Sequence, residues 1–444
     1  MPSIMTRLMQ PTAHTDPVTG SAVYPLGSRV NERGHLEVGG CDVVELAREF
    51  GTPAYVYAEQ DVRERARAYL SAFGRHTDSF EVLFASKAAP FTAFYRLCQE
   101  EGLSVDVASG GELHMALAAG FKPSRIYFHG NNKTAAELRY ASEAGVGHVI
   151  LDSFDELARL DGLLDHPQDV LIRVTPGIKA DTHSYIQTGQ LDSKFGFGLE
   201  DGLAARAIAE VRASSNLRLV GLHAHIGSQI FELEPYVRAI EALGALAADC
   251  ALTPDELRLL NVGGGLGIAY TAADEPPSIE GYVDVKVEGV RRVFEQAPRI
   301  LVEPGRSIAG NAGITVYEVG TVKEIPGVRT YVAVDGGMSD NMRPMLYGAR
   351  YEALIANRAA EAAATRATIA GMHCESSDIL VREAELAAPR VGDLLVTPAT
   401  GAYGYAMASN YNGVPRPPVV LCKDGDARVV VRRETWDDLM GRDV

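Results

Sequence analysis

Residues 81–130 read EVLFASKAAPFTAFYRLCQEEGLSVDVASGGELHMALAAGFKPSRIYFHG and contain three short apolar runs that end in polar residues. The segments between these runs have apolar residues at helical spacing. In GGELHMALAAGF (110–121), for example, apolar residues recur at i, i+3, i+4 and i+7. An apolar strand followed by an amphipathic helix is the repeating unit of parallel α/β folds. This stretch therefore predicts consecutive βα units.

The same alternation extends from about residue 52 to residue 305 and supplies eight strand candidates. Eight βα units predict a closed (β/α)8 barrel. An open doubly wound sheet is the alternative that the strand count leaves open. The candidates are residues 81–87, 104–109, 125–130, 148–152, 170–176, 217–227, 257–265 and 299–305.

The pattern changes after residue 305, where strand-like alternation between Gly, Pro and Asp turns predicts a mostly β domain over 306–444. We therefore expect an α/β protein with its barrel over 51–305. Residues 24–50 contain the strand-like piece HLEVGG and are expected to join the β domain. Residues 1–23 show no periodicity and are expected to form a flexible arm.

Composition narrows the function before any motif is considered. The 444 residues carry a formal net charge of −16, which argues against a nucleic-acid partner. No window of about 18 apolar residues is free of charge, so we expect no membrane span. The five cysteines show no C-x-x-C spacing, and the N-terminus lacks the apolar stretch of a signal peptide. We expect a cytoplasmic protein with reduced thiols.

Polar residues stand at the ends of several predicted barrel strands, which is where barrel enzymes carry their chemistry. Lys87 ends the first strand after the apolar run 81–86. We expect its amine to be desolvated, because burial lowers the pKa of a lysine and makes the amine a nucleophile for a carbonyl carbon. A surface lysine at the start of a loop is the alternative.

The run GGGLG (263–267) follows the seventh predicted strand, at a position where barrels often bind phosphate. Glycine backbones approach an anion closely and direct N–H groups at it. The run is not a dinucleotide fingerprint, since Ile268 occupies the last required glycine position. A plain tight turn is the alternative to phosphate binding.

The segment HAHIGSQ (223–229) places His223 and His225 on one face of a strand. A flat imidazole can pack on a flat ring, and two imidazoles can also converge on a metal ion. No third ligand stands at a recognisable spacing, so we expect no metal site. A purely structural histidine is the third interpretation.

Two further motifs join a carboxylate to a second reactive group. EPGRS (303–307) offers Glu303 to a heterocyclic nitrogen and Arg306 to a carboxylate, unless the two residues form an ion pair. CESSD (374–378) places Cys374 beside a carboxylate as a candidate proton donor, with an inert buried cysteine as the alternative. Candidate anion binders or ordinary surface residues are Arg343, Tyr347 and Tyr403.

Lys87, the glycine run, His225 and Glu303 are all expected at one barrel mouth. This set suits pyridoxal phosphate: the amine meets the aldehyde carbon, the glycines the phosphate, the imidazole the ring face and the carboxylate the pyridine nitrogen. A carboxylate in that position keeps the ring nitrogen protonated, which makes the cofactor a strong electron sink. The sequence therefore predicts a pyridoxal-phosphate enzyme.

The motifs FASKA, DVASGGEL, HAHIGSQ, GGGLG, EPGRS, NMRP, CESSD and SNYN follow one another between about residues 50 and 415. Together they resemble the fold-type III pyridoxal-phosphate decarboxylases, specifically the diaminopimelate decarboxylases. The resemblance implies an alanine-racemase-like barrel with a β domain, and a homodimer whose active sites lie between subunits. It also implies conversion of meso-2,6-diaminopimelate to L-lysine and carbon dioxide, the last step of lysine biosynthesis.

The resemblance implies a role for each matching residue. Lys87 is the Schiff-base lysine, and Cys374 is the proton donor that reaches in from the partner subunit. Glu375 holds the distal ammonium of the substrate. The implied cofactor-binding residues are Lys87, Asp106, His225, Ser228, Gly264, Gly265, Gly267, Glu303, Gly305, Arg306 and Tyr403. The implied substrate-binding residues are Arg306, Arg343, Tyr347, Glu375 and Tyr403.

Glu375 favours diaminopimelate over ornithine, because ornithine-type relatives carry Asp after the cysteine. The sequence departs from the family pattern at Ala89, where Asn is usual, and at Ser377, where Gly is common. A decarboxylase for another amino acid, free or on an acyl-carrier protein, is the nearest alternative. A non-catalytic relative is a second one, which the presence of Lys87 and Cys374 argues against.

Overall fold

A closed barrel of eight parallel strands forms the larger part of the molecule. The computed structural model describes residues 16–178 and 193–444, and within them the pairing of β8 with β9 completes the ring. Every predicted barrel strand is present, so the (β/α)8 barrel is confirmed and the open sheet is excluded. The strands are β5 (Phe80–Ala85), β6 (Ser104–Val107), β7 (Ile126–Phe128), β8 (His148–Leu151), β9 (Gln168–Thr175), β11 (Leu217–His223), β12 (Leu259–Asn261) and β13 (Arg299–Val302).

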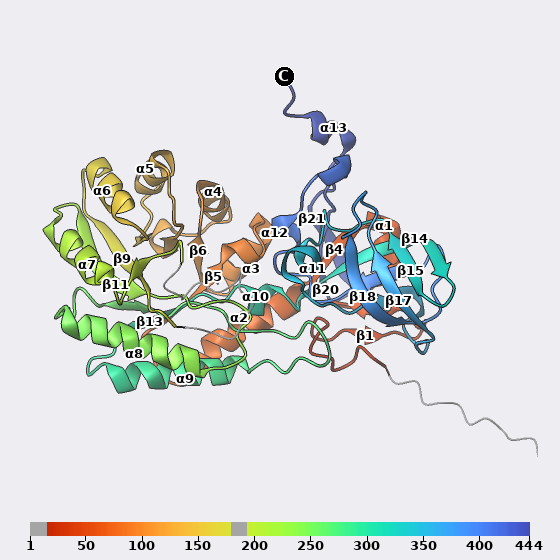
Figure 1. Cartoon of the computed structure of the whole chain (residues 1–444), viewed down its shortest axis with the longest axis horizontal. Helices are drawn as coiled ribbons and strands as arrows, with labels where there is room; N and C mark the ends of the chain where they lie inside the picture. Colours follow the sequence, from red (N-terminus) through yellow and green to blue (C-terminus); the bar gives the residue numbers. More distant parts are fainter. Residues whose placement is uncertain (1–15, 179–192) are drawn as a thin grey trace, which may run out of the picture.

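Helices alternate with these strands and cover the outside of the barrel (Figure 1). Several begin at once after a strand, because a serine caps the first turn. The Ser109 and Ser153 hydroxyls accept hydrogen bonds from the backbone N–H groups of Glu112 and Glu156. The helices include α2 (Glu59–Gly74), α3 (Thr92–Glu100), α4 (Gly110–Ala118), α5 (Ala135–Glu143), α6 (Phe154–Leu163), α7 (Leu203–Ala213), α8 (Glu234–Asp249) and α9 (Ile279–Val293).

The barrel interior is filled with side chains and is not a channel. One buried cluster contains inward-facing residues from seven of the eight barrel strands, and none of its members is more than 9% exposed. Such packing leaves the ends of the strands as the place for a binding site. The cluster consists of Leu83, Tyr127, Ile150, Leu171, Val220, Leu259 and Leu301.

A second sheet forms the β domain beside the barrel (Figure 1). The strand β4 lies inside the range expected for the barrel, yet it pairs with β14 and β20 of this sheet, and all five of its residues are buried. The sheet order is β18 (Ile379–Leu386), β17 (Thr365–Ala370), β15 (Arg329–Val334), β14 (Gly313–Ile325), β4 (Ala54–Ala58), β20 (Val419–Lys423) and β21 (Asp426–Val431), with β19 (Leu394–Thr397) also on β14.

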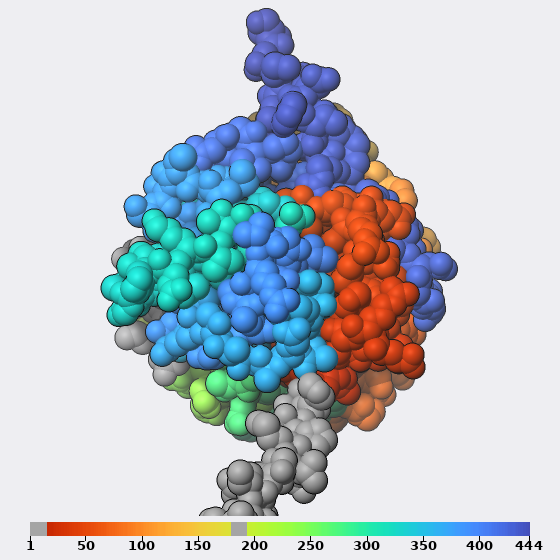
Figure 2. Space-filling view, turned by 90° about the vertical axis from the view of Figure 1, so that its right-hand side faces the viewer, coloured from red at the N-terminus to blue at the C-terminus, as the bar shows by residue number. Residues whose placement is uncertain are grey.

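The N-terminal segment packs on the β domain (Figure 2). Its strands β1 (Arg29–Val30), β2 (Leu36–Val38) and β3 (Cys41–Asp42) form a small sheet of their own, and α1 (Val43–Phe50) follows them. Residues 1–15, most of the expected arm, lie outside the described residues. None of the helices in the described part of the chain has the length and apolar character to cross a membrane.

Candidate active site

A cavity of about 280 Å³ lies at the mouth of the barrel. It is bounded by the C-terminal ends of the barrel strands and the segments that follow them, together with Tyr403 of the β domain. Nine of the predicted cofactor-binding residues line it, whereas Gly264 and Gly267 lie outside its lining. The nine are Lys87, Asp106, His225, Ser228, Gly265, Glu303, Gly305, Arg306 and Tyr403.

Glu303 is the buried centre of this cavity. Asn261 Nδ2 donates a hydrogen bond to its Oε1 atom at 2.6 Å. His129 Nε2 lies 2.9 Å from Oε1, and His223 Nε2 lies 3.3 Å from Oε2. Burial alone would raise the pKa of Glu303, but the two histidines hold it well below its usual range. The histidines therefore stabilise the negative charge of the carboxylate at the barrel mouth.

Asp106 extends this charged network across the cavity. Its Oδ1 atom lies 3.9 Å from His129 Nε2. Burial raises the pKa of Asp106 to about 6, with a further contribution from the nearby Glu303 charge, while His129 opposes the rise. The two carboxylates raise the pKa of His129 against the effect of its own burial. A second acidic group of this cavity thus titrates near neutral pH.

The histidines of HAHIGSQ have different partners and do not form a pair. His223 turns to Glu303, whereas the His225 Nδ1 atom accepts a hydrogen bond from the Gly264 N–H at 3.2 Å. The side-chain nitrogen and oxygen atoms that could ligate a metal ion lie within 4.8 Å of one another in His129, His223 and Glu303. This arrangement serves to hold the Glu303 carboxylate in one orientation.

The glycines at 263, 264, 265 and 267 have no room for a side chain. A Cβ atom at Gly264 would lie 2.1 Å from the Glu303 carbonyl oxygen, and one at Gly267 would lie 2.8 Å from the Phe231 ring. Gly263 and Gly265 have φ values of +63° and +103°, which residues other than glycine rarely adopt. The run is more than a tight turn, because its backbone packs against two neighbouring strand ends.

Arg306 does not pair with Glu303. It begins the short helix α10 (Arg306–Ala309), donates a hydrogen bond to Ser228 Oγ at 2.9 Å and donates another to the Tyr270 hydroxyl. Its guanidinium lies 4.7 Å from the centre of the Tyr403 ring. The ion pair considered from the sequence is therefore absent, and the guanidinium faces the cavity.

Arg343 of the β domain joins the same cluster. It begins α11 (Arg343–Tyr347), donates to the Tyr351 hydroxyl at 2.5 Å, and lies 4.7 Å from the centre of the Tyr270 ring. The Tyr347 ring centre is 6.0 Å from the same guanidinium. Burial would raise the pKa of Tyr270, but the two arginines lower it. Sequence reasoning missed Tyr270, because nothing in GGGLGIAY marks it.

Lys87 lies in the turn Ser86–Ala88 at the edge of the cavity, and its side chain is exposed. The expectation of a desolvated amine is wrong, since the residue follows the packed strand and stands above the barrel core. The turn itself is fixed. Glu112 accepts hydrogen bonds from Ser86 Oγ at 2.6 Å and from the Ala108 N–H at 2.7 Å.

Cys374 and Glu375 lie apart from the cavity. Both are exposed, so the inert buried cysteine considered from the sequence is excluded, and neither lines the cavity of its own chain. Their loop, between β17 and β18, is held by Asp378, whose carboxylate accepts hydrogen bonds from the backbone of Met338 at 2.7 Å and of His373 at 2.9 Å. Glu375 accepts a hydrogen bond from the Tyr411 hydroxyl.

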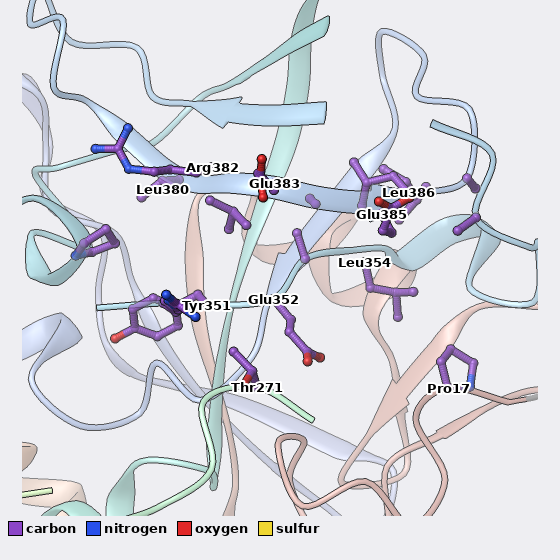
Figure 3. A pocket seen from close by; sticks show the side chains of 18 of the residues that line it. Pro17, Thr271, Tyr351, Glu352, Leu354, Leu380, Arg382, Glu383, Glu385 and Leu386 are labelled. Carbon is purple, nitrogen blue, oxygen red and sulfur yellow. The ribbon is translucent and has the colours of Figure 1, made fainter. Parts of the chain in front are cut away.

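A larger cavity, of about 1230 Å³, lies in the β domain along β18 (Figure 3). Tyr351, Glu352 and Leu380 are among its lining residues. None of the predicted site residues lines it. The smaller cavity is therefore the candidate active site, because the charged network and the glycine run are found there.

The smaller cavity fits pyridoxal phosphate. The buried Glu303 carboxylate is ionised, as a partner for a protonated pyridine nitrogen must be. A primary amine stands at the edge of the cavity on Lys87. The glycine backbone of Gly265 and Gly305, together with Ser228, supplies surroundings without bulky side chains for an anionic group.

Comparison with known proteins agrees with this chemistry. Residues 59–310 match the family described as pyridoxal-dependent decarboxylase, pyridoxal binding domain. Diaminopimelate decarboxylase of Bacillus subtilis is 49% identical over 425 residues, which covers 94% of this chain and 97% of the relative. The Mycobacterium tuberculosis enzyme is 43% identical over 439 residues, with 95% and 98% covered.

Among solved structures, the M. jannaschii diaminopimelate decarboxylase in complex with L-lysine superposes with a TM-score of 0.88. It is 33% identical, and the match covers 95% of this chain and 98% of the other. The barrel, the β domain and about 95% of the chain are thus shared with these enzymes. The chain belongs to the diaminopimelate decarboxylases, within the pyridoxal-dependent decarboxylase family.

Proposed function

We propose that this enzyme decarboxylates meso-2,6-diaminopimelate to L-lysine and carbon dioxide, the last step of lysine biosynthesis. The observation that carries the proposal is that a buried Glu303 and Arg306 line one cavity at the barrel mouth, with Arg343 held beside Arg306 on the Tyr270 ring. The carboxylate suits a protonated cofactor ring, and the guanidinium groups suit an amino-acid carboxylate. Bound pyridoxal phosphate supplies the electron sink that accepts the electron pair of the broken Cα–carboxylate bond.

The residues of the barrel mouth hold the cofactor in this proposal. Lys87 would hold the cofactor covalently through its aldehyde carbon, and its amine would be free while the substrate amine takes its place. Glu303 keeps a proton on the ring nitrogen, because His129 and His223 stabilise its negative charge. His225 covers one face of the ring, and Asp106 lies on the same charged network. The anionic group is bound by Ser228 and by the glycines at 264, 265, 267 and 305.

In this proposal two sets of side chains select the substrate, one by binding a carboxylate and the other by binding the distal ammonium group. Arg306 and Arg343 share the Tyr270 ring, so their guanidinium groups are held together with Tyr347 and Tyr403 beside them. We assign these residues to a carboxylate of the substrate. Glu375 supplies a negative charge for the distal ammonium group, as expected for a substrate with an amine at each end.

Cys374 supplies the proton that replaces the lost carboxylate on Cα. Its thiol is exposed and stands outside the cavity of its own chain. We therefore propose that the enzyme is a homodimer in which Cys374 of the partner subunit completes each active site. This arrangement would cover two residues that are exposed in the single chain. The free cysteines of the described residues also favour the proposed cytoplasmic location.

Release of carbon dioxide from amino acids tests the proposal. Purified enzyme with added pyridoxal phosphate is offered meso-diaminopimelate, ornithine, arginine or lysine in separate assays. We expect fast release from diaminopimelate with formation of L-lysine, and little release from the other three. Faster release from ornithine, arginine or lysine would reject the proposed substrate while leaving the decarboxylase chemistry in place.

A further inference from the structure

Lys286 is a fully buried lysine on α9 that pairs with no carboxylate in the parts of the chain that the structure describes. Its Nζ atom lies 4.4 Å from the centres of both the Tyr236 and Tyr282 rings. Burial lowers the pKa of this amine well below its usual value. Burying a polar amine costs free energy unless it is hydrogen-bonded, so the hydrogen-bond partners of Lys286 indicate what the residue contributes.

The hydrogen bonds of Lys286 lead to the start of the glycine run. Nζ donates to the carbonyl oxygen of Val262 and, at 3.3 Å, to that of Gly263. The Tyr282 hydroxyl donates to the same Gly263 oxygen at 3.0 Å, and the Glu303 N–H does so at 3.2 Å. One backbone carbonyl therefore has three donors, two of them side chains of α9.

The Gly263 carbonyl and the Gly264 N–H belong to one peptide group. In a planar trans peptide these two groups point in opposite directions. Because α9 holds the carbonyl on its own side, the N–H is turned the other way, where it donates to His225 Nδ1 at 3.2 Å. A single peptide thus connects a buried lysine to the imidazole that lines the cavity.

This connection determines where His225 carries its proton. Desolvation, together with the nearby Lys87 charge, holds the pKa of His225 well below its usual value, so the ring is neutral. A neutral imidazole has one donor and one acceptor nitrogen. Since Nδ1 accepts from Gly264, the proton resides on Nε2. Loss of the Gly263–Gly264 orientation would remove this preference.

We propose that Lys286 is a positioning residue that sets the orientation and tautomer of His225 through the Gly263–Gly264 peptide. The inference rests on the proposed function, in which His225 covers the cofactor ring. Lys286 itself does not line the cavity, so its effect on the cofactor passes through this peptide.

The substitution Lys286→Met tests the inference, because it keeps the length of the side chain and removes its donors. Two quantities are measured on the full chain after dialysis: the dissociation constant of pyridoxal phosphate, from its absorbance, and the ¹⁵N shifts of the His225 ring in histidine-labelled protein. We expect the dissociation constant to rise roughly tenfold to a hundredfold. We also expect the single Nε2–H tautomer to become a mixture.

Tyr236 and Tyr282 both pack their rings against Lys286 Nζ, so substitutions at these two positions provide a matched pair of test and control. Tyr282→Phe removes a hydroxyl that donates to Gly263, and we expect a smaller shift of both quantities in the same direction. Tyr236→Phe removes a buried hydroxyl with no hydrogen-bond partner among the described residues, and we expect no change. Lys286→Arg keeps donors at this position and should recover part of the affinity.

A folded Lys286→Met variant with wild-type affinity and an unchanged His225 tautomer would overturn the inference. Equal effects of Tyr236→Phe and Tyr282→Phe would also overturn it, because they would indicate general packing. If Lys286→Met does not fold, the comparison of Tyr282→Phe with Tyr236→Phe tests the inference by itself: an effect of the first substitution alone supports it, and equal effects overturn it. Failure of the wild-type chain to bind pyridoxal phosphate would instead reject the proposed function.

Discussion

The barrel mouth and the loop that carries Cys374 are built in opposite ways. The barrel mouth surrounds a cavity, and its central carboxylate is 7% exposed. This carboxylate has hydrogen-bonding partners on β11 and β12 and lies 2.9 Å from His129, which follows β7. The Cys374 loop is also anchored, through the hydrogen bonds of the Asp378 carboxylate, yet the side chains of Cys374 and Glu375 are exposed. The residues of one region line a cavity of their own chain, and the two side chains of the other are exposed on theirs.

This difference indicates that cofactor binding and proton donation belong to different regions of the molecule. A cofactor site needs a desolvated, preorganised network, and a single barrel can supply one. A proton donor that is exposed on its own chain can act in a water-excluded site only when another surface covers it. The comparison therefore predicts that cofactor binding and proton delivery are separable by mutation, and that they come from different subunits.

The largest effect should come from Lys87→Ala in the barrel mouth. Removing the amine removes the covalent attachment of the cofactor, so we expect carbon dioxide release to fall by more than about ten-thousandfold. The measurement is release from meso-diaminopimelate. Lys122→Ala, at an exposed lysine of the barrel, is the control and should remain fully active. Appreciable turnover by Lys87→Ala would remove this residue from the mechanism.

Cys374→Ala should separate the two regions. We expect turnover to fall about a hundredfold to ten-thousandfold, as for loss of a general acid, while the affinity for pyridoxal phosphate stays at the wild-type value. Turnover is measured by carbon dioxide release and affinity by absorbance titration. Cys250→Ala serves as the matched cysteine control. Equal loss of cofactor binding would contradict the proposed division between the regions.

Asp106→Asn tests the charged network of the barrel mouth, because burial raises the pKa of this carboxyl group. The pKa of Asp106 is about 6 in the folded chain, against a usual value of 3.8. The folded state therefore keeps this proton between about pH 4 and pH 6 while the unfolded state releases it, so the stability that the group contributes falls as the pH rises through this range.

The asparagine variant lacks this titration. Between about pH 4 and pH 6 we expect the free energy of unfolding of the variant to gain about 3 kcal/mol relative to wild type. Chemical denaturation at several pH values, each at constant ionic strength, measures the difference. A difference between the two proteins that stays constant across this range would show that Asp106 does not titrate there.

Tyr270→Phe addresses the point where the barrel and the β domain meet. Its hydroxyl accepts a hydrogen bond from Arg306, and its ring lies against Arg343. We expect the KM for diaminopimelate to rise about tenfold, because one bond to a charged group is lost, with little change in kcat. Tyr351→Phe, which affects Arg343 alone, should raise KM less. A fall in kcat at constant KM would argue against a role in substrate binding.

The fold could be predicted because each barrel strand is short, apolar and buried. Such strands form uninterrupted runs bounded by turn residues, and all eight runs coincide with observed strands. Once the strands are placed, the topology brings their final residues to one mouth. This is why Lys87, Asp106, His225 and Glu303 line one cavity although more than two hundred positions separate the first from the last.

The contacts within the site could not be predicted in the same way. Asn261 and Tyr270 become neighbours of the predicted residues only when the ring closes. Lys286 sits in an amphipathic helix, where a lysine normally marks the solvent face, and its burial depends on the tyrosines around it. The sequence left a desolvated and a surface position open for Lys87, because the apolar run before it says nothing about the turn that follows.

Subunit complementation tests the central claim most directly. Lys87→Ala and Cys374→Ala chains are mixed in equal amounts, dissociated and reassociated, and carbon dioxide release is measured. If Cys374 acts across the dimer, half of the dimers contain one intact site of two, and activity returns to about a quarter of wild type. If mixed dimers form, as mass spectrometry can verify, and activity stays at the level of the separate mutants, then both groups act within one chain and the proposed division is wrong.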